Sequence, residues 1–186
     1  MKKNSNKGAS TQTGMRFETK SVSFLKKELL SKFQFKIDES NKQHIEFLRG
    51  DGSSFYLTAK HDFYSHLEKK DPFCKKSVSS ILLPDSAIIF EDYSKVIVFE
   101  IKNQEVQGSV DEKLQTCDFK KKQYLKILKK ISPLKLSFEY VYLLSNWFKK
   151  AKYQDTLQYI KDSGCSFYFM EDPGLITFLE ELINSD

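Results

Sequence analysis

The chain has 186 residues, of which 40% are hydrophobic and 30% charged, a balance typical of one globular domain with a core of its own. The longest apolar stretch, residues 80–90, is much shorter than the roughly 20 residues that cross a bilayer. The polar N-terminus lacks the apolar segment of a secretion signal, and the three cysteines show no CxxC spacing. We therefore expect a cytoplasmic protein with reduced thiols and no association with a membrane.

Positive charge is concentrated in one part of the chain. The net charge is +5, yet residues 111–152 alone hold eleven lysines and four acids. A basic segment of this kind suits a polyanion, because neutralised phosphates release counterions; a solvated helix face is the simpler alternative. Only Arg16 and Arg49 are arginines, and arginine makes the commonest specific contacts to bases. The composition therefore favours holding DNA over reading its sequence; a lysine-rich bias of the genome is the alternative explanation.

The N-terminal part is predicted to contain one helix and two strands. Residues 1–14 are polar and are expected to form a mobile tail. Residues 15–33 carry apolar side chains at helical spacing, which predicts an amphipathic helix. Two strands are predicted at 43–48 and 54–59, because a glycine-containing turn signal at 49–52 separates two runs of strand-forming residues.

Strands and helices are predicted to alternate in the rest of the chain. Residues 60–80 are polar and are read as a loop with at most one helical turn. Strands are expected at 81–90, 95–102, 137–144 and 166–170, and helices at 111–131, 149–161 and 174–183. The whole chain, residues 1–186, is thus predicted to be a single α/β domain with a central mixed sheet flanked by helices on both faces.

Three charged residues lie at the ends of two otherwise apolar strands. Such strands are expected in the centre of a sheet, where ionised side chains are costly. Glu100 and Lys102 are two residues apart, so they project from one face of their strand. A hairpin turn centred on residues 92–93 pairs residues whose numbers sum to 185. This register sets Asp85 opposite Glu100.

Two facing carboxylates indicate a site for a divalent cation. Cross-strand neighbours have Cβ atoms about 4.5–5.5 Å apart, so the two carboxylates repel each other unless a cation lies between them. Hard oxygen ligands suit Mg²⁺, with Mn²⁺ as a substitute. Lys102 could then position the attacking water or stabilise charge on a phosphate. The structural alternative is that Asp85 ends a turn after Pro84, while Glu100 and Lys102 form an ion pair at a strand end.

The spacing of these residues resembles a known nuclease motif. The pattern Pro84-Asp85 … Glu100-Ile101-Lys102 is similar to that of the PD-(D/E)xK nuclease superfamily. The resemblance implies a restriction-endonuclease-like core. It also implies that the carboxylates bind the metal and that the lysine assists attack on the scissile phosphate.

Residues beyond the motif extend the predicted site. Gln104 shares the face of Lys102 if the strand continues, and some members of the superfamily carry a glutamine there. We expect it to orient water or phosphate, with a solvated strand-end glutamine as the alternative. Ser109 is a candidate N-cap for the next helix, with Glu112 at the capping-box position. The positive end of that helix is expected to point at a DNA phosphate.

Further DNA and metal contacts are predicted on two helices. On the helix at 111–131, Leu114, Cys117, Tyr124, Leu125 and Leu128 form an inner stripe, with Lys122, Lys126, Lys129 and Lys130 opposite. The predicted DNA contacts there are Lys113, Lys122, Lys126 and Lys129. The start of the first helix, Gly14 to Glu18, resembles that of several superfamily members in which the glutamate approaches the metal. The alternative for Glu18 is simply a favourable position near a helix N-terminus; Glu28 is a second candidate.

The size of the chain suggests a dependent nuclease. A single core with few arginines is similar to the small subunit of a heterodimeric type IIS restriction endonuclease. The resemblance implies that this subunit cuts one strand of double-stranded DNA and depends on a larger subunit, which recognises the sequence and nicks the other strand. One alternative is a stand-alone structure-specific nuclease of the junction-resolvase or repair type. Another is a DNA-binding or assembly protein in which the three charged residues are a structural cluster.

Overall fold

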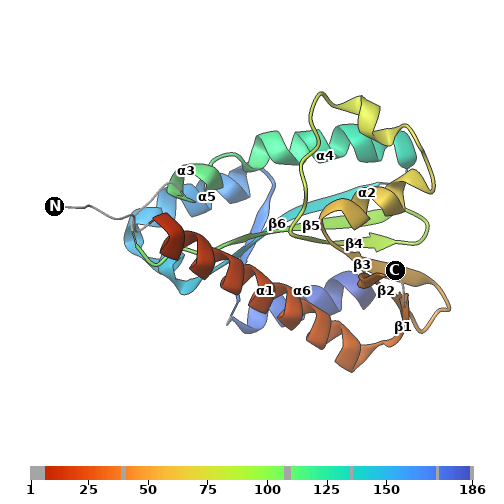
Figure 1. The fold of residues 1–186 in the computed structure, drawn as a ribbon, viewed down its shortest axis with the longest axis horizontal. Coiled ribbons are helices and arrows are strands. Elements are labelled where there is room, and N and C mark those ends of the chain that lie inside the picture. Colours follow the sequence, from red (N-terminus) through yellow and green to blue (C-terminus); the bar gives the residue numbers. More distant parts are fainter. Residues whose placement is uncertain (1–6, 39–40, 107–109, 135, 171, 185–186) are drawn as a thin grey trace.

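The fold is an α/β arrangement built around one seven-stranded sheet (Figure 1). The computed structural model describes residues 7–38, 41–106, 110–134, 136–170 and 172–184. The strands are β1 (Gln34–Asp38), β2 (Asn41–Leu48), β3 (Ser54–Thr58), β4 (Ser86–Phe90), β5 (Lys95–Lys102), β6 (Ser137–Leu144) and β7 (Ser166–Phe169). The helices are α1 (Lys7–Lys32), α2 (Lys60–Glu68), α3 (Val110–Leu114), α4 (Cys117–Ile131), α5 (Gln154–Asp162) and α6 (Pro173–Asn184). The strands lie side by side in chain order.

The first five strands form an antiparallel meander. In the β4–β5 pair, Ser86 lies opposite Phe99 and Ile89 opposite Val96. The numbers of the paired residues sum to 185, so the predicted register is confirmed. The turn between the strands has four residues. Tyr93 adopts a positive φ of 58° there, and the Asp92 carboxylate accepts a 2.9 Å hydrogen bond from the backbone N–H of Ser94.

The last three strands are parallel, which makes the sheet mixed. Helix α4 carries the chain from β5 to β6, and α5 carries it from β6 to β7. In the β5–β6 register Lys102 pairs with Leu144, so both strands end at the same edge, on the side where α3 and α5 lie (Figure 1). In open α/β sheets, ligands bind at this carboxyl end of the strands.

Two hydrophobic cores cover the two faces of the sheet. Alternate residues of β5 belong to different cores: Val96 and Val98 pack with residues of α2, α4 and α5, whereas Ile97 and Phe99 pack with residues of α1 and α6. Figure 1 shows α2 and α4 on one side of the sheet and α1 and α6 on the other. The predicted α/β sheet with helices on both faces is therefore confirmed.

The N-terminal third differs most from the sequence prediction. Helix α1 begins at Lys7, eight residues before the predicted start at residue 15, so the prediction that the helix begins after the polar segment is wrong. Strand β1 was not predicted. Its alternating Phe35 and Ile37 gave a signal, but both side chains remain over 40% exposed at the sheet edge.

The predicted loop at 60–80 is also wrong. It contains α2 and the short 3-10 helix η1 (Cys74–Ser77). Phe63, Tyr64 and Leu67 are completely buried, and their spacing of one helical turn explains why this polar segment folds as a helix.

The later elements agree better with the prediction. Strands β5 and β6 have the predicted bounds, but β4 begins only at Ser86. The helix expected at 111–131 breaks into α3 and α4, where the Thr116 hydroxyl donates to the Lys113 carbonyl at 2.7 Å and competes with helix continuation. The helix expected at 149–161 begins at Gln154, after the 3-10 turns η2 (Asn146–Lys149) and η3 (Ala151–Tyr153).

Within the described ranges, the helices are too short or too polar to cross a membrane. Cys74, Cys117 and Cys165 are free thiols, and all three are buried.

Candidate active site

Asp85 is fixed immediately before β4. It is only 8% exposed, and its Oδ2 accepts a 2.8 Å hydrogen bond from the backbone N–H of Ile101 on the neighbouring strand. The β4–β5 register, carried one residue further, places Asp85 opposite Glu100. The carboxylate thus takes the place of the next backbone hydrogen bond between the two strands, and it is held beside the end of β5.

Lys102 brings the predicted residues together. Glu100 and Lys102 share the face of β5 that holds Val96 and Val98. The Lys102 Nζ lies 2.7 Å from Glu100 Oε1, 3.1 Å from the Ile101 carbonyl oxygen and 3.8 Å from Asp85 Oδ2. One cationic nitrogen therefore lies where three oxygens converge.

A second lysine reaches Glu100 from α4. The Lys120 Nζ lies 2.7 Å from Glu100 Oε1, and the Lys120 side chain is 20% exposed. Sequence reasoning missed this residue. The signal was its helical position, because Lys120 lies three residues after Cys117 and four before Tyr124, which are both buried.

A third lysine connects Asp85 to α1. The Lys60 ammonium contacts Asp85 Oδ1 and lies 2.8 Å from Glu18 Oε1. Lys60 also has a φ of 50°, a backbone conformation that is unfavourable for a residue with a side chain. Its position was not predicted, and no sequence signal indicates a positive φ at a lysine. Glu18 reaches the cluster through Lys60.

The pKa shifts follow from this arrangement. Burial alone raises the pKa of Glu100, but the charges of Lys102 and Lys120 and their hydrogen bonds bring it below its ordinary value of 4.5. Burial alone lowers the pKa of Lys60, yet hydrogen bonds to Asp85 and Glu18 raise it above the ordinary value. The ionised forms of both groups are therefore favoured at neutral pH.

Gln104 is close to the cluster in the chain but not on the strand. Strand β5 ends at Lys102, so the expected continuation of the strand is wrong. Gln104 is 6% exposed, and neither atom of its side-chain amide has a hydrogen-bond partner among the described residues. Its backbone N–H donates to Ser145 Oγ at 3.3 Å. The amide is therefore buried, which rules out the alternative of a solvated glutamine.

The other predicted contacts lie outside this cluster. Ser109 falls outside the described residues. Lys113 is exposed on α3, and Lys122, Lys126 and Lys129 are exposed on α4. Lys129 lies nine positions after Lys120, which corresponds to about 14 Å along the helix. Glu28 lies ten residues beyond Glu18, about 15 Å along α1, so the structure does not bring it to the site.

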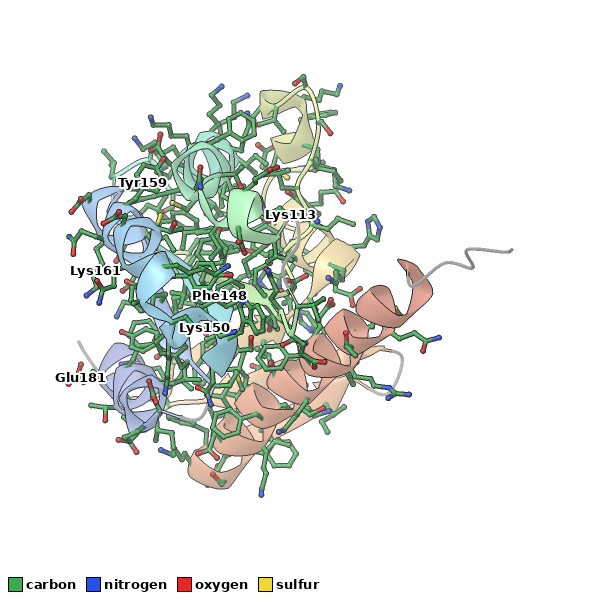
Figure 2. All side chains as sticks on the ribbon, turned by 90° about the vertical axis from the view of Figure 1, so that its left-hand side faces the viewer. Lys113, Phe148, Lys150, Tyr159, Lys161 and Glu181 are labelled. Carbon is green, nitrogen blue, oxygen red and sulfur yellow. The ribbon has the colours of Figure 1, made fainter. Side chains whose placement is uncertain are left out.

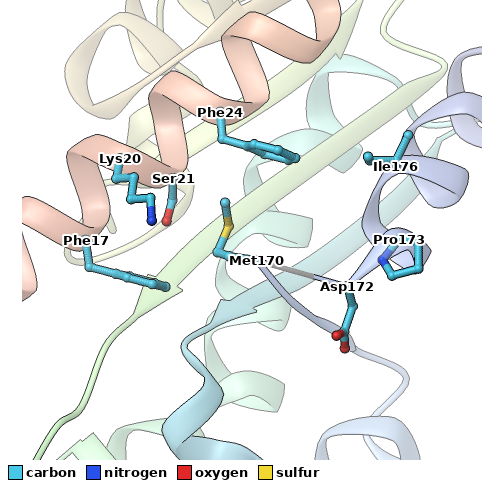
Figure 3. A pocket seen from close by; sticks show the side chains of 8 residues that line it. All are labelled: Phe17, Lys20, Ser21, Phe24, Met170, Asp172, Pro173 and Ile176. Carbon is cyan, nitrogen blue, oxygen red and sulfur yellow. The ribbon is translucent and has the colours of Figure 1, made fainter.

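Two of the hollows in the described part of the chain lie beside the middle of α1. One of about 310 Å³ includes Glu18, Lys60 and Asp85 in its lining, and also Thr58, whose hydroxyl is buried without a partner among the described residues. The other, of about 480 Å³, lies between α1 and the start of α6 and contains Phe17 and Met170 (Figure 3). Only the first hollow borders the predicted site.

The donor atoms of the cluster decide which cation it can bind. In the described parts of the chain, no three or more histidine, cysteine, aspartate or glutamate side chains are grouped as metal ligands. Asp85, Glu100 and the Ile101 carbonyl nevertheless present hard oxygens to one point, where Lys102 Nζ now lies. Oxygens of this type suit Mg²⁺ or Mn²⁺ far better than a soft metal.

The arrangement combines carboxylates and ammonium groups at the edge of the sheet where parallel strands β5 and β6 end. These groups can bind a cation, orient water and stabilise negative charge on a substrate. Comparisons of the chain with protein-family models, with curated proteins and with solved structures find no match.

Proposed function

We propose that this protein is a magnesium-dependent DNA endonuclease with a restriction-endonuclease-like core of the PD-(D/E)xK type. The observation that carries the proposal is the position of the Lys102 ammonium among oxygens of Asp85, Glu100 and Ile101. Strand register, not chain proximity, brings Asp85 to this point. A carboxylate pair beside a lysine is suited to hydrolysis of a phosphodiester.

The metal ion would be held by Asp85 and Glu100. Their oxygens and the Ile101 carbonyl fit a hard cation. Glu18 would join them only after Lys60 leaves its place between Glu18 and Asp85. When bound, Mg²⁺ would lower the pKa of a bound water and neutralise charge on the phosphate, and Mn²⁺ can supply the same chemistry.

The other side chains have distinct roles in this proposal. Lys102 would orient the attacking water and stabilise the charge that develops on the phosphate. In the described structure, the Lys120 ammonium contacts the Glu100 carboxylate. Lys120 would therefore be a positioning residue that keeps this carboxylate ionised. Gln104 would orient water or phosphate through its amide, which has no protein partner among the described residues.

The energetic cost of the cluster supports a catalytic role. Asp85 and Glu100 are each 8% exposed, and burying charges is expensive even when they are paired. Well-packed apolar residues at the same places are often equally or more stabilising. A cluster of partly buried charges at the edge where ligands bind is therefore more readily explained by chemistry than by stability.

A structural ion-pair cluster is the second candidate. Each carboxylate has a lysine partner: Glu18 with Lys60, Asp85 with Lys60 and Lys102, and Glu100 with Lys102 and Lys120. Such a cluster is electrically balanced without a metal ion. Metal binding separates the two candidates, because a balanced structural cluster has no affinity for Mn²⁺.

The decisive experiment is a Mn²⁺ titration by calorimetry or electron paramagnetic resonance, followed by cleavage of plasmid DNA in Mg²⁺. We expect the wild type to bind Mn²⁺, and Asp85→Asn and Glu100→Gln to lose both binding and cleavage. Asp118→Asn is the matched control, because Asp118 pairs with Lys122 on the exposed side of α4. Equal Mn²⁺ binding by the wild type and Glu100→Gln would remove the proposed site.

The restriction-subunit role is a further part of the proposal. It rests on the resemblance of the motif and on the presence of only two arginines among the thirty basic residues. In a plasmid that the larger recognition subunit nicks on the other strand, addition of this chain should yield linear DNA, whereas this chain alone should leave the plasmid uncut. Efficient double-strand cutting by this chain alone would contradict the subunit role and favour the stand-alone nuclease.

A further inference from the structure

A lysine-rich segment follows directly from the strand beside the site. Residues 146–153 contain three lysines and no acid. The backbone N–H of Ser145, just before this segment, donates to the Lys102 carbonyl at 3.1 Å, and Ser145 Oγ accepts from Gln104. Lys150 lies five positions after Ser145, a reach of at most about 18 Å. The segment is thus tied to the end of β5 that carries the site.

Each lysine of this segment lies over an aromatic ring. Lys150 Nζ is 2.9 Å from the centre of the Trp147 ring, and Lys152 Nζ is 4.5 Å from that of Tyr153. Lys149 Nζ lies over Phe169 at 4.9 Å. Such cation–π contacts hold ammonium groups at the surface without neutralising their charge.

Lys150 differs from its neighbours in its charge partners. Lys149 pairs with Asp172 at 2.8 Å, and Lys152 lies 3.5 Å from Asp111. Lys150 has no carboxylate partner within the described ranges, and it is exposed. Figure 2 shows it on the same side of the molecule as Lys113. Its charge is therefore available to an anion.

The segment is rigidly held despite its exposure. The Trp147 indole N–H donates to the Tyr153 hydroxyl at 2.7 Å, and that hydroxyl donates to Asp111 Oδ1 at 2.9 Å. Phe148 and Tyr153 are buried in the core. A rigid platform loses little conformational entropy when a ligand binds.

We propose that this segment binds the phosphate backbone of the DNA strand next to the cleaved bond, with Lys150 as the main contact. This inference rests on the proposed nuclease function and names the surface that holds its substrate. Lysine binds phosphate as a point charge without reading sequence, which fits a chain with two arginines. When the ammonium moves to a phosphate, the face of Trp147 is uncovered, and aromatic faces of this kind stack on nucleobases.

The single tryptophan of the chain makes the proposal directly measurable. Full-length protein is titrated in EDTA with a short DNA duplex and with one of its single strands, and both Trp147 fluorescence and DNA anisotropy are recorded. We expect DNA to change Trp147 emission. Lys150→Ala should weaken DNA binding about tenfold at low salt and reduce the salt slope by about one.

Lys161→Ala is the matched control. Lys161 is also an exposed lysine over an aromatic ring, at 5.3 Å from Phe167, and it lies on the last turn of α5. Equal losses of affinity in Lys150→Ala and Lys161→Ala would overturn the inference, as would unchanged Trp147 emission at saturating DNA. The same emission change with a polyglutamate peptide would also overturn it, because the surface would then bind any polyanion.

The outcome is separable from that of the proposed function. Cleavage by the wild type in Mg²⁺ tests the nuclease activity alone. A wild type that cleaves DNA without any Trp147 response contradicts this surface and leaves the nuclease in place. A wild type that binds DNA through Lys150 but neither cleaves it nor binds Mn²⁺ contradicts the nuclease and leaves a DNA-binding surface.

Discussion

The lysines of this protein occupy two contrasting environments. Lys60, Lys102 and Lys120 come from three different elements and converge on carboxylates at one edge of the sheet. Lysines on the outer side of α4 project into solvent; Lys122, for example, is 67% exposed and pairs with Asp118 one turn away. The number of lysines in a segment therefore says little about their role, whereas burial and carboxylate partners distinguish positioned charges from solvated ones.

Replacement of one lysine from each environment should give the largest difference in cleavage rate. Lys102→Met removes the ammonium nearest to the converging oxygens, so we expect the cleavage rate at saturating DNA to fall by about 10²–10³-fold. Lys130→Met, on the exposed side of α4, should stay within about twofold of wild type. Single-turnover cleavage measures both rates. Similar rates for the two variants would show that the two groups of lysines do not differ in function.

The contact between Lys120 and Glu100 should also contribute to stability. Lys120→Met leaves Glu100 with one cationic partner instead of two, and we expect a loss of about 1–2 kcal/mol in unfolding free energy at pH 7. A double-mutant cycle with Glu100→Gln isolates the pair. If the two losses are additive in urea unfolding, the 2.7 Å contact contributes nothing.

The same contact gives the site a defined dependence on pH. The pKa of Glu100 is lowered in the folded state from the ordinary value of 4.5. The unfolded chain therefore binds the proton more readily, and the stabilisation is fully present above 4.5 and lost as the pH falls through the lower folded pKa. The stability difference between wild type and Glu100→Gln should shrink over that acidic range. A difference that stays constant down to pH 3 would contradict the assigned shift.

Lys60 differs from the α4 lysines in its backbone as well as in its partners. Its φ of 50° penalises any residue with a Cβ, whereas glycine adopts this conformation freely. Lys60→Ala and Lys60→Gly both remove the ion pairs, so their difference reports the backbone alone. We expect the glycine variant to be more stable by about 1 kcal/mol in urea unfolding. A less stable glycine variant would mean that the positive φ carries no strain.

Features of the site that depend on interactions between residues close in sequence were predictable, whereas those that depend on tertiary packing were not. The bounds of β5 and the pairing of Asp85 with Glu100 were predictable, because they depend on a short turn and on strand alternation. Lys60 and Lys120 reach the cluster from α2 and α4 through tertiary packing. Lys120 lies in a run of three lysines, and only the helical phase relative to Cys117 distinguishes it from its neighbours.

Errors in the predicted elements have a similar origin. The segment at 60–80 looks polar, but Phe63, Tyr64 and Leu67 lie at helical spacing and are buried. Strand β1 alternates clearly, yet it is short and lies at the edge of the sheet. In both places the local pattern is short, and packing against the rest of the chain determines whether the segment forms a helix or a strand.

The exposed lysines of α4 provide the smallest expected effect on the folded protein. Lys126→Ala and Lys129→Ala should each change the unfolding free energy by less than about 0.5 kcal/mol, because both residues are exposed and alanine is a strong helix former. Their predicted role is contact with phosphates at a distance from the cleaved bond. The double variant should therefore reduce the salt dependence of DNA binding by up to about two phosphate contacts while its cleavage rate at saturating DNA stays unchanged. An unchanged salt slope would remove this face of α4 from the proposed DNA surface and leave the converging lysines and Lys150 as the proposed contacts to DNA.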